Sequence, residues 1–269
     1  MNILNILCRR QSKINYIFFN PDILKIIRKE TLGSTNAYAE KMIASGVAGS
    51  PFCVVADRQT SGKGRGNNQW DSEAGENLTF SIVCFPEFLR AEKQFYLNKA
   101  VALSVYEFIS NLATQKDVAI KWPNDIYIGS KKVAGTLFQT AVQGAIMKNV
   151  IIGIGININQ EKFPENLPNP TSVFIETSTK TELVPALNQY LDIFEKYYGW
   201  LEEKRFEDIH NHYIKKLYRF GQRSLFEFDK KPIQATICGV DEYGWLQLLT
   251  DEGVVLSGEM DKVKMIIEP

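Results

Sequence analysis

The sequence predicts an α+β fold in which a larger domain of strands and helices precedes a small β-barrel of about 50 residues. Apolar runs of strand length alternate with segments of helical periodicity over the first two thirds of the chain. Beyond Arg219, short apolar runs are separated by turn residues such as Asp, Gly and Pro, which is typical of a small all-β unit. We therefore divide the chain into an N-terminal extension at 1–19, the larger domain at 20–218 and the barrel at 219–269.

Local patterns predict the elements in order. A short helical pattern covers 22–28, and a second helix begins at an N-cap formed by Ser34 or Thr35. Apolar residues at helical spacing predict a helix at 99–114 and a helix-rich segment at 182–217, whose apolar stripe is interpreted as core packing. Strands of the larger domain are predicted at 51–57, 78–85, 118–122, 132–139 and 149–157. Barrel strands are predicted at 224–228, 233–240, 245–250, 254–257 and 263–267.

Composition limits the function classes. Lysine and arginine together number 31, as do aspartate and glutamate, so the net charge offers no general attraction to DNA or to an acidic membrane. The four cysteines form no Cys-x-x-Cys pair, which argues against zinc and a disulfide framework and favours reduced thiols in the cytoplasm. No apolar run approaches the roughly 20 residues that span a bilayer. Residues 1–19 do not follow the pattern of a secretory signal and are interpreted as a loose extension or an early strand.

A glycine-rich basic loop, Gly62-Lys63-Gly64-Arg65-Gly66, is the first candidate for chemistry. Alternating glycines let the backbone approach a ligand, while the amide groups and two cations can face one anion, so phosphate is the natural guest. The pattern is neither a Walker loop nor a Rossmann fingerprint. On its own it also fits a flexible linker or an arginine-glycine element that binds RNA.

Three further motifs accompany predicted strands. Lys121-Trp122-Pro123-Asn124-Asp125 presents a cation, an amide and a carboxylate on a turn stiffened by proline, a set that suits a nucleotide with bound magnesium. Lys131-Lys132-Val133-Ala134-Gly135 begins a strand, so alternation turns one lysine inward beside two small residues. Gly155-Ile156-Asn157 ends an apolar run with an amide that can bind a purine edge or a phosphate. The structural alternatives are a solvated carboxylate, a hairpin end and a turn-forming asparagine.

The order of these motifs resembles that in the catalytic domain of biotin protein ligases. The resemblance covers about 30–160 and is carried by Ser34-Thr35-Asn36, by the loop at 59–70 and by the three motifs above. The tail, with Gly239-Val240-Asp241 followed by Gly244, resembles the C-terminal SH3-like barrel of the same family. The resemblance implies a mixed-sheet catalytic domain of the biotin/lipoate protein ligase type. It also implies a two-step ligase reaction: biotin and ATP form biotinyl-5'-AMP and pyrophosphate, and the adenylate then acylates one lysine of a biotin carboxyl carrier protein domain.

The resemblance assigns roles to individual residues. Lys132 would pair with the biotin carboxylate and later with the acyl phosphate, Arg65 would close over the adenylate, and Asp125 would bind Mg²⁺ or approach the acceptor lysine. These three are the catalytic candidates. The biotin-binding residues implied are Ser34, Thr35, Gln59, Lys63, Gly64, Lys132 and Gly135. Those implied on the ATP or adenylate side are Arg65, Gly66, Trp70, Lys121, Asn124 and Asn157.

Two departures from the family affect the expected partners and binding. Some members carry an N-terminal DNA-binding domain, for which this chain lacks the length, so we expect a ligase with no DNA or membrane partner. Asn67 and Asn68 stand where family loops often continue with a further glycine and arginine, which predicts weaker anion binding after Arg65. A homodimer formed through an exposed sheet edge is left open.

Three alternatives compete with this interpretation. A lipoate or octanoate ligase shares the catalytic fold but resembles a pattern with a histidine-aspartate pair, whereas His210 and His212 lie far downstream on a predicted helix and are interpreted as solvated surface residues. A nucleic-acid-binding protein is disfavoured by the zero net charge and the lack of interleaved basic and aromatic residues. A noncatalytic carrier-binding module has no use for the full set of ligand-binding residues.

Overall fold

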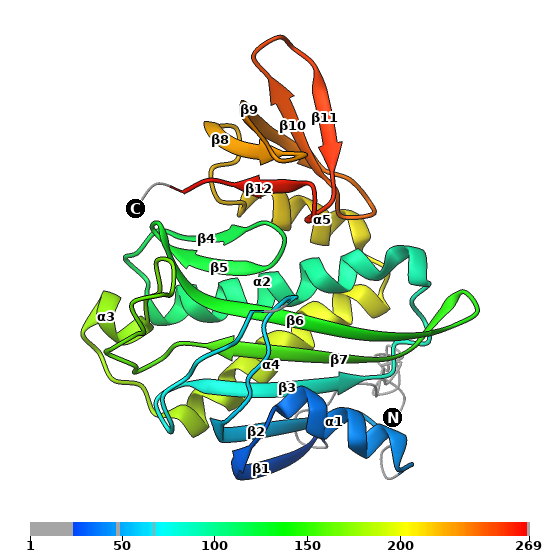
Figure 1. Ribbon diagram of the computed structural model, residues 1–269. Coiled ribbons are helices and arrows are strands. Elements are labelled where there is room, and N and C mark those ends of the chain that lie inside the picture. Colours follow the sequence, from blue (N-terminus) through cyan, green and yellow to red (C-terminus); the bar gives the residue numbers. More distant parts are fainter. Residues whose placement is uncertain (1–23, 47–48, 67, 268–269) are drawn as a thin grey trace, which may run out of the picture.

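Two sheets organise the molecule. The computed structural model describes residues 24–46, 49–66 and 68–267, so the predicted extension at 1–19 lies outside the described residues. A seven-stranded sheet has the order β1-β2-β3-β7-β6-β5-β4, and a five-stranded sheet has the order β11-β10-β9-β8-β12. Figure 1 shows the smaller sheet as a separate unit beside the larger one. In the large sheet β1 and β2 are parallel and the other neighbours antiparallel, which confirms a mixed sheet.

The predicted strands of the larger domain are present, several with longer bounds. They are β2 (Phe52–Gln59), β3 (Leu78–Cys84), β4 (Val118–Lys121), β6 (Lys131–Gln143) and β7 (Ile146–Ile156). The sheet is completed by β1 (Lys25–Leu32) and β5 (Asp125–Ile128), which were not predicted as strands. The five strands predicted after Arg219 form the antiparallel small sheet. They are β8 (Arg223–Phe228), β9 (Lys231–Val240), β10 (Leu246–Thr250), β11 (Val255–Gly258) and β12 (Val263–Met265).

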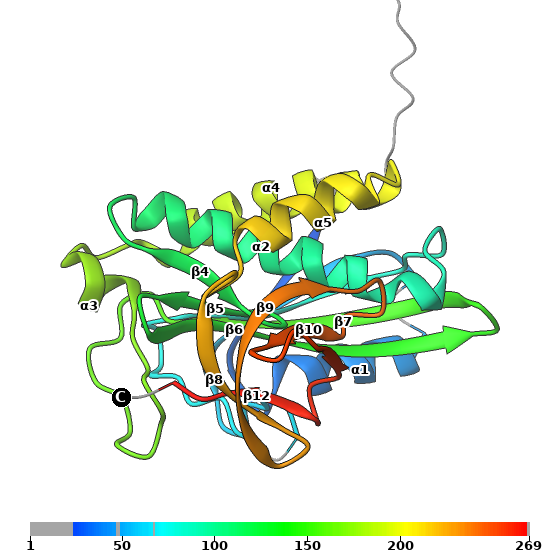
Figure 2. The same cartoon turned by 90° about the horizontal axis from the view of Figure 1, so that it is seen from above.

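Helices cover the two faces of the large sheet unequally (Figure 2). The helices α2 (Gln94–Leu112), α4 (Leu183–Glu202) and α5 (Phe206–Lys215) lie together on one face, where they bury the main apolar cluster. The single helix α1 (Thr35–Ala44) packs on the opposite face over a smaller cluster that contains Ala39, Phe52 and Val54. Part of that second face is therefore left for a ligand.

The structure corrects the N-terminal prediction. The segment predicted as a helix at 22–28 is part of β1 from Lys25 onward, and its first two residues lie outside the described ones. Ile26 packs against the main cluster and Ile27 against the second one, so adjacent apolar residues point to opposite faces. That period of two is a strand property, and pairing with β2 stabilises it. Three short elements were not predicted: β5, the 3-10 helix η1 (Ala91–Lys93) and the helix α3 (Val173–Thr177).

Candidate active site

A cavity of about 550 Å³ lies on the face that α1 leaves open. Its wall comes from the start of α1, the glycine-rich loop, the 121–125 segment and strands β6 and β7. The small sheet closes it, because Met260, Val263, Lys264 and Met265 also line it. The cavity is thus shared between the two sheets.

Positive charge dominates this cavity. Its described lining contains the cationic side chains of Lys63, Arg65, Lys121, Lys132 and Lys264, and Asp125 is the one carboxylate among them. Because burial removes water from a cation, it lowers the pKa of Lys121, with the neighbouring Lys132 and Lys264 acting in the same direction and Asp125 opposing them. A polyanionic ligand would neutralise this excess charge.

Lys132 and Asp125 face each other across neighbouring strands. The Lys132 Nζ atom lies 2.7 Å from Asp125 Oδ1, and the two side chains are 31% and 28% exposed. The preceding residue, Lys131, points away from the cavity, and its Nζ atom lies 3.4 Å from Glu176 Oε1. Strand alternation therefore turns one lysine of the pair into the cavity, as predicted. A Cβ atom at Gly135 would lie 3.0 Å from Lys132 Nζ, which explains the small residue there.

The glycine-rich loop folds as a short hairpin. Lys63 and Gln69 form an isolated bridge, and the Trp70 N–H donates to the Gly62 carbonyl at 3.0 Å. A Cβ atom at Gly62 would lie 2.3 Å from the Trp70 carbonyl oxygen, so the close approach requires glycine. The guanidinium of Arg65 reaches Asp261 of the small sheet at 2.7 Å, with both side chains largely exposed.

Two glycines of β7 make room for side chains from other elements. A Cβ atom at Gly153 would lie 2.3 Å from Asn36 Oδ1, and one at Gly155 would lie 2.2 Å from the indole of Trp70. The indole of Trp70 thus rests directly on the sheet, and the Lys132 ammonium lies 5.9 Å from the ring centroid. Two predicted site residues, Trp70 of the loop and Lys132 of β6, therefore lie next to each other on the sheet.

Gly155→Ala is expected to displace the Trp70 indole and to lower the free energy of unfolding by about 1–3 kcal/mol, because the added methyl group overlaps the ring. The shift of the tryptophan fluorescence and the melting temperature measure both effects. Gly199→Ala is the control, because a Cβ atom at Gly199 meets nothing within 4 Å outside its own helix; it should keep the wild-type fluorescence and melt at or slightly above the wild-type temperature, since alanine favours a helix interior over glycine. A Gly155→Ala protein with the fluorescence and melting temperature of the wild type would contradict this packing.

A buried hydrogen-bond network occupies the end of the cavity next to α1. The Thr35 N–H and hydroxyl both donate to Gln59 Oε1, at 2.8 and 3.1 Å. The Ser81 hydroxyl lies 2.7 Å from Thr35 Oγ1 and 2.6 Å from Asn36 Oδ1, and Asn36 also donates to Gln139. Ser34 occupies the N-cap position of α1 without a side-chain capping bond. This end suits a neutral polar group with donors and acceptors in fixed positions.

The predicted site residues are largely brought together by this cavity. Those that line it are Ser34, Thr35, Gln59, Lys63, Gly64, Arg65, Trp70, Lys121, Asn124, Asp125, Lys132 and Gly135. Gly66 does not line it, because it forms the hairpin turn with φ +62°. Asn157 is 5% exposed and also lies outside the lining; its amide donates to the Thr171 carbonyl at 2.9 Å, while its Oδ1 atom has no partner among the described residues.

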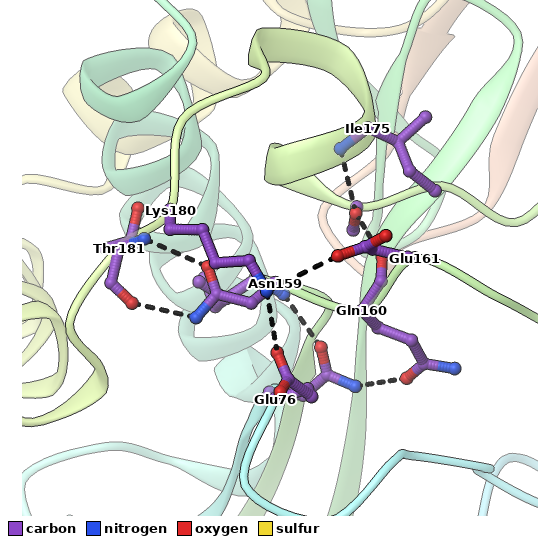
Figure 3. Close-up of polar contacts among 10 residues, drawn as sticks. Glu76, Asn159, Gln160, Glu161, Ile175, Lys180 and Thr181 are labelled. Atoms are coloured by element: carbon purple, nitrogen blue, oxygen red, sulfur yellow. Dashed lines mark hydrogen bonds and ion pairs between the residues drawn. The ribbon is translucent and has the colours of Figure 1, made fainter.

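The segment after Asn157 is structural (Figure 3). Asn159 and Thr181 exchange two hydrogen bonds of 2.9 Å, and Gln160 accepts from the Glu73 N–H at 3.1 Å. The Lys180 ammonium lies 3.4 Å from Glu161 and thereby covers the cluster. These bonds hold the segment after β7 against Thr181 and against Glu73, which precedes β3. The polar residues of this segment are therefore needed for packing.

Comparisons with known proteins agree with this geometry. The model of the biotin/lipoate A/B protein ligase family matches residues 29–157. The bifunctional ligase/repressor BirA of Bacillus subtilis is 31% identical over 233 residues, which cover 85% of this chain and 70% of that protein. The chain belongs to the biotin/lipoate A/B protein ligase family. A biotin--[acetyl-CoA-carboxylase] ligase of Paracoccus denitrificans is 29% identical over 220 residues, covering 80% of this chain and 90% of that protein.

A solved member of the family has the same architecture. The biotin protein ligase from Aquifex aeolicus in complex with biotin and ATP superposes with a TM-score of 0.75 at 26% identity, covering 91% of this chain and 99% of that one. The small sheet is therefore part of the shared architecture. None of the described helices is long and apolar enough to cross a membrane.

Several residues of this family site were not predicted from the sequence. Ser81 and Gln139, which hydrogen-bond Asn36 next to the cavity, and Lys264 with the apolar groups of the small sheet, which line it, belong to none of the motifs. Ser81 lies in an apolar strand without a motif, and the pairing of β3 with β2 and β7 brings it to the α1 end. Lys264 has no sequence signal that distinguishes it from a solvated barrel lysine.

The described residues do not form a resident metal site. No group of three His, Cys, Asp or Glu side chains in the described part of the chain could hold an ion. Asp125, the metal candidate, is paired with Lys132 and stands among cations. A single carboxylate in this setting does not fit a bound metal without further oxygen ligands.

Proposed function

We propose that this chain is a biotin--[biotin carboxyl-carrier protein] ligase, which forms biotinyl-5'-AMP from biotin and ATP and transfers the biotinyl group to one lysine of a carrier domain. The observation that carries the proposal is the pairing, in one cavity, of a neutral hydrogen-bonding end with a surplus of cations. Biotin has a matching division between a ureido head and a carboxylate tail. The similarity to curated biotin ligases supports the same substrates.

Charge repulsion is the main obstacle that this site would overcome. In the first step the biotin carboxylate attacks the α-phosphate of ATP, and pyrophosphate leaves with the electron pair of the broken P–O bond. Fixed cations reduce the repulsion between the two anions and stabilise the charge that develops on the phosphoryl oxygens. In the second step the amine of the carrier lysine attacks the acyl carbon, and AMP leaves.

The side chains divide between the two ligands. We assign the ureido end to Ser34, Thr35 and Gln59, because all three line the cavity next to α1, where Ser34 and Thr35 are buried and Gln59 accepts two hydrogen bonds from Thr35. Lys132 lies where the biotin carboxylate and the α-phosphate would meet, and Asp125 orients its ammonium group. The residues left for the nucleotide are Arg65, Trp70, Lys121 and Asn124. Asn157 is buried outside the cavity lining, so its proposed contact with the nucleotide rests on its unpartnered Oδ1 atom alone, which can accept a hydrogen bond from an amino group of the nucleotide.

The magnesium ion, the domain division, the partners and the location of the protein are further parts of the proposal. We propose that Mg²⁺ enters bound to the ATP phosphates, because the residues that the structure describes include no group of three His, Cys, Asp or Glu side chains that could hold it. The division at about 218 into a catalytic domain and a small barrel is proposed from the two separate sheets. The carrier partner, the lack of a DNA partner, a homodimer and the cytoplasmic location remain predictions.

The test is the labelling of a biotin carboxyl carrier domain by the purified protein. With ATP and biotin, mass spectrometry should find one biotinylated lysine on the carrier, and omission of ATP should abolish the product. Lipoate in place of biotin is the second arm. Labelling with lipoate and none with biotin would replace the proposal with the lipoate alternative.

A further inference from the structure

A buried lysine outside the cavity has no role in the proposed chemistry. Lys99 of α2 is 0% exposed, and its ammonium lies within 6 Å of three aromatic ring centroids, those of Phe95, Tyr96 and Tyr213. Its hydrogen-bond partners are His210 Nδ1 at 3.0 Å and the Asp241 carbonyl at 3.3 Å. His210 is therefore not the solvated surface residue that the sequence predicts.

The protonation of this cluster is consistent with its geometry. Burial lowers the pKa of His210, and the Lys99 charge lowers it further, so the ring is neutral and its Nδ1 atom can accept from the ammonium. Burial also lowers the pKa of Lys99 to about 8, while Asp241 and Glu242 raise it and Lys93 lowers it. Near neutral pH the lysine is charged and donates to both acceptors.

Lys99 binds a turn of the small sheet to the catalytic domain. The turn at 241–245 between β9 and β10 accepts the Lys99 hydrogen bond at its first residue. At Gly244 the turn touches the Phe95 ring so closely that a Cβ atom would lie 2.3 Å away, and φ of +93° also requires glycine. Lys93 and Glu242 form an ion pair beside it. Figure 1 shows α5, which carries His210, directly beneath the small sheet.

The 241–245 turn in its place holds the 121–125 segment, which carries residues assigned to the nucleotide. The Trp122 indole N–H donates to the Gly244 carbonyl at 3.0 Å. The next residue, Pro123, has its carbonyl bound by the Tyr213 hydroxyl at 2.7 Å, and the Tyr213 ring packs beside Lys99. The Trp122 side chain and the Pro123 carbonyl are thus both held by groups that surround Lys99, namely the 241–245 turn and Tyr213. Lys121, Asn124 and Asp125, which flank it, line the cavity.

We propose that Lys99 is a positioning residue that holds the 121–125 segment in place for the nucleotide through the 241–245 turn and Tyr213. The inference rests on the proposed function, since it concerns how that site is held. It explains why a lysine is kept in an aromatic pocket that an apolar side chain could fill. It also gives the small sheet a role in setting the nucleotide side of the cavity.

The test uses Lys99→Met, which keeps the bulk and removes the donors, and Tyr213→Phe, which removes the single hydroxyl contact to Pro123. In biotin-dependent pyrophosphate exchange, both variants should raise the KM for ATP roughly 3- to 10-fold, the effect expected when one hydrogen bond (Tyr213→Phe) or two (Lys99→Met) are lost and only part of that loss reaches the nucleotide. The KM for biotin should stay unchanged, because its predicted contacts lie at the α1 end. A loss of folded protein alone would lower the apparent kcat and leave both KM values unchanged.

Lys196→Met is the matched control. Lys196 also lies over an aromatic ring, 4.6 Å from the Tyr197 centroid, but it pairs with Glu107 and has no contact with the turn. Its KM values should equal those of the wild type. Hydrogen exchange of the amides at 121–125 gives a readout that does not depend on activity, and it should be faster in Lys99→Met and Tyr213→Phe than in Lys196→Met.

If the wild type shows no biotin-dependent exchange, the proposed function fails while the hydrogen-exchange comparison still tests the contact. If the wild type is active but both variants keep its KM for ATP and its amide protection at 121–125, Lys99 is not a positioning residue and the inference is overturned.

A pH dependence follows from the same burial. The pKa of Lys99 in the folded protein, about 8, lies below its ordinary value of 10.5. Between these values the unfolded chain keeps a proton that the folded protein has lost, so raising the pH through this window stabilises the folded state. The free energy of unfolding of the wild type should therefore rise relative to that of Lys99→Met between pH 7 and pH 10, measured by urea denaturation. A constant difference would show that Lys99 titrates normally.

Discussion

Lys132→Ala is expected to lower biotin-dependent pyrophosphate exchange by about 10²–10³-fold, the loss typical of removing one preorganised charge-stabilising group. Lys132 faces the cavity between Asp125 and the Trp70 ring, where the biotin carboxylate and the α-phosphate would meet. The fold should persist, because a partly exposed ion pair contributes only ~0–1 kcal/mol to stability. Exchange rates and melting temperatures, measured on the same preparation, separate the two effects.

The neighbouring lysine provides the control for this prediction. Lys131 is next in sequence, carries the same charge and points to Glu176 outside the cavity. Lys131→Ala should leave exchange within about twofold of the wild type, since exposed pairs contribute little. Equal activity losses in the two variants would mean that general charge, and not the position of Lys132, matters. Unchanged exchange in Lys132→Ala would remove this lysine from the mechanism.

Arg65→Gly is expected to release the adenylate into solution and to label bystander lysines. Arg65 is on the hairpin, it lines the cavity, and its guanidinium lies 2.7 Å from Asp261 of the small domain. Without it, closure of the hairpin over the mixed anhydride would be weaker, and water and foreign amines would reach the acyl carbon. Mass spectrometry of a bystander protein without a carrier domain should detect biotinylated lysines with the variant and almost none with the wild type.

Asp261→Asn separates the two contacts that Arg65 can make. The Arg65–Asp261 pair is exposed, with side chains 50% and 84% accessible, so it should contribute little on its own. If the Arg65 cation holds the adenylate, Asp261→Asn keeps the labelling on the carrier lysine. Bystander labelling as strong as that of Arg65→Gly would show that the ion pair holds the hairpin closed. Labelling of the carrier alone by Arg65→Gly would contradict the predicted role of Arg65.

Periodicity and turn residues predict most of the fold because the buried elements of this chain are long. The strands β3 and β7 and the helices α2 and α4 have strong apolar patterns. The edge strand β1 was predicted as a helix, since eight mostly exposed residues carry little pattern and its pairing with β2 decides the conformation. The four-residue strand β5 is too short for periodicity to detect.

The candidate site is less evenly predictable. Motif residues such as Lys132, Asp125 and Gln59 reach the cavity because each lies at a strand end or strand start, where the local pattern already sets the direction of the side chain. Lys264 and Ser81 could not be predicted, because only the packing of distant segments brings Lys264 to the cavity and Ser81 to the Thr35 and Asn36 side chains that line it. Lys99 could not be predicted either, since its aromatic surroundings come from α2 and α5 together.

The most direct test of the central claim is the exchange of labelled pyrophosphate into ATP by the purified protein. This exchange reports adenylate formation without any carrier protein. We expect exchange that depends on biotin, is not supported by lipoate, and is lost in Lys132→Ala. Exchange with lipoate and not with biotin, or no exchange with either acid from a folded protein, would contradict the claim that this cavity activates biotin.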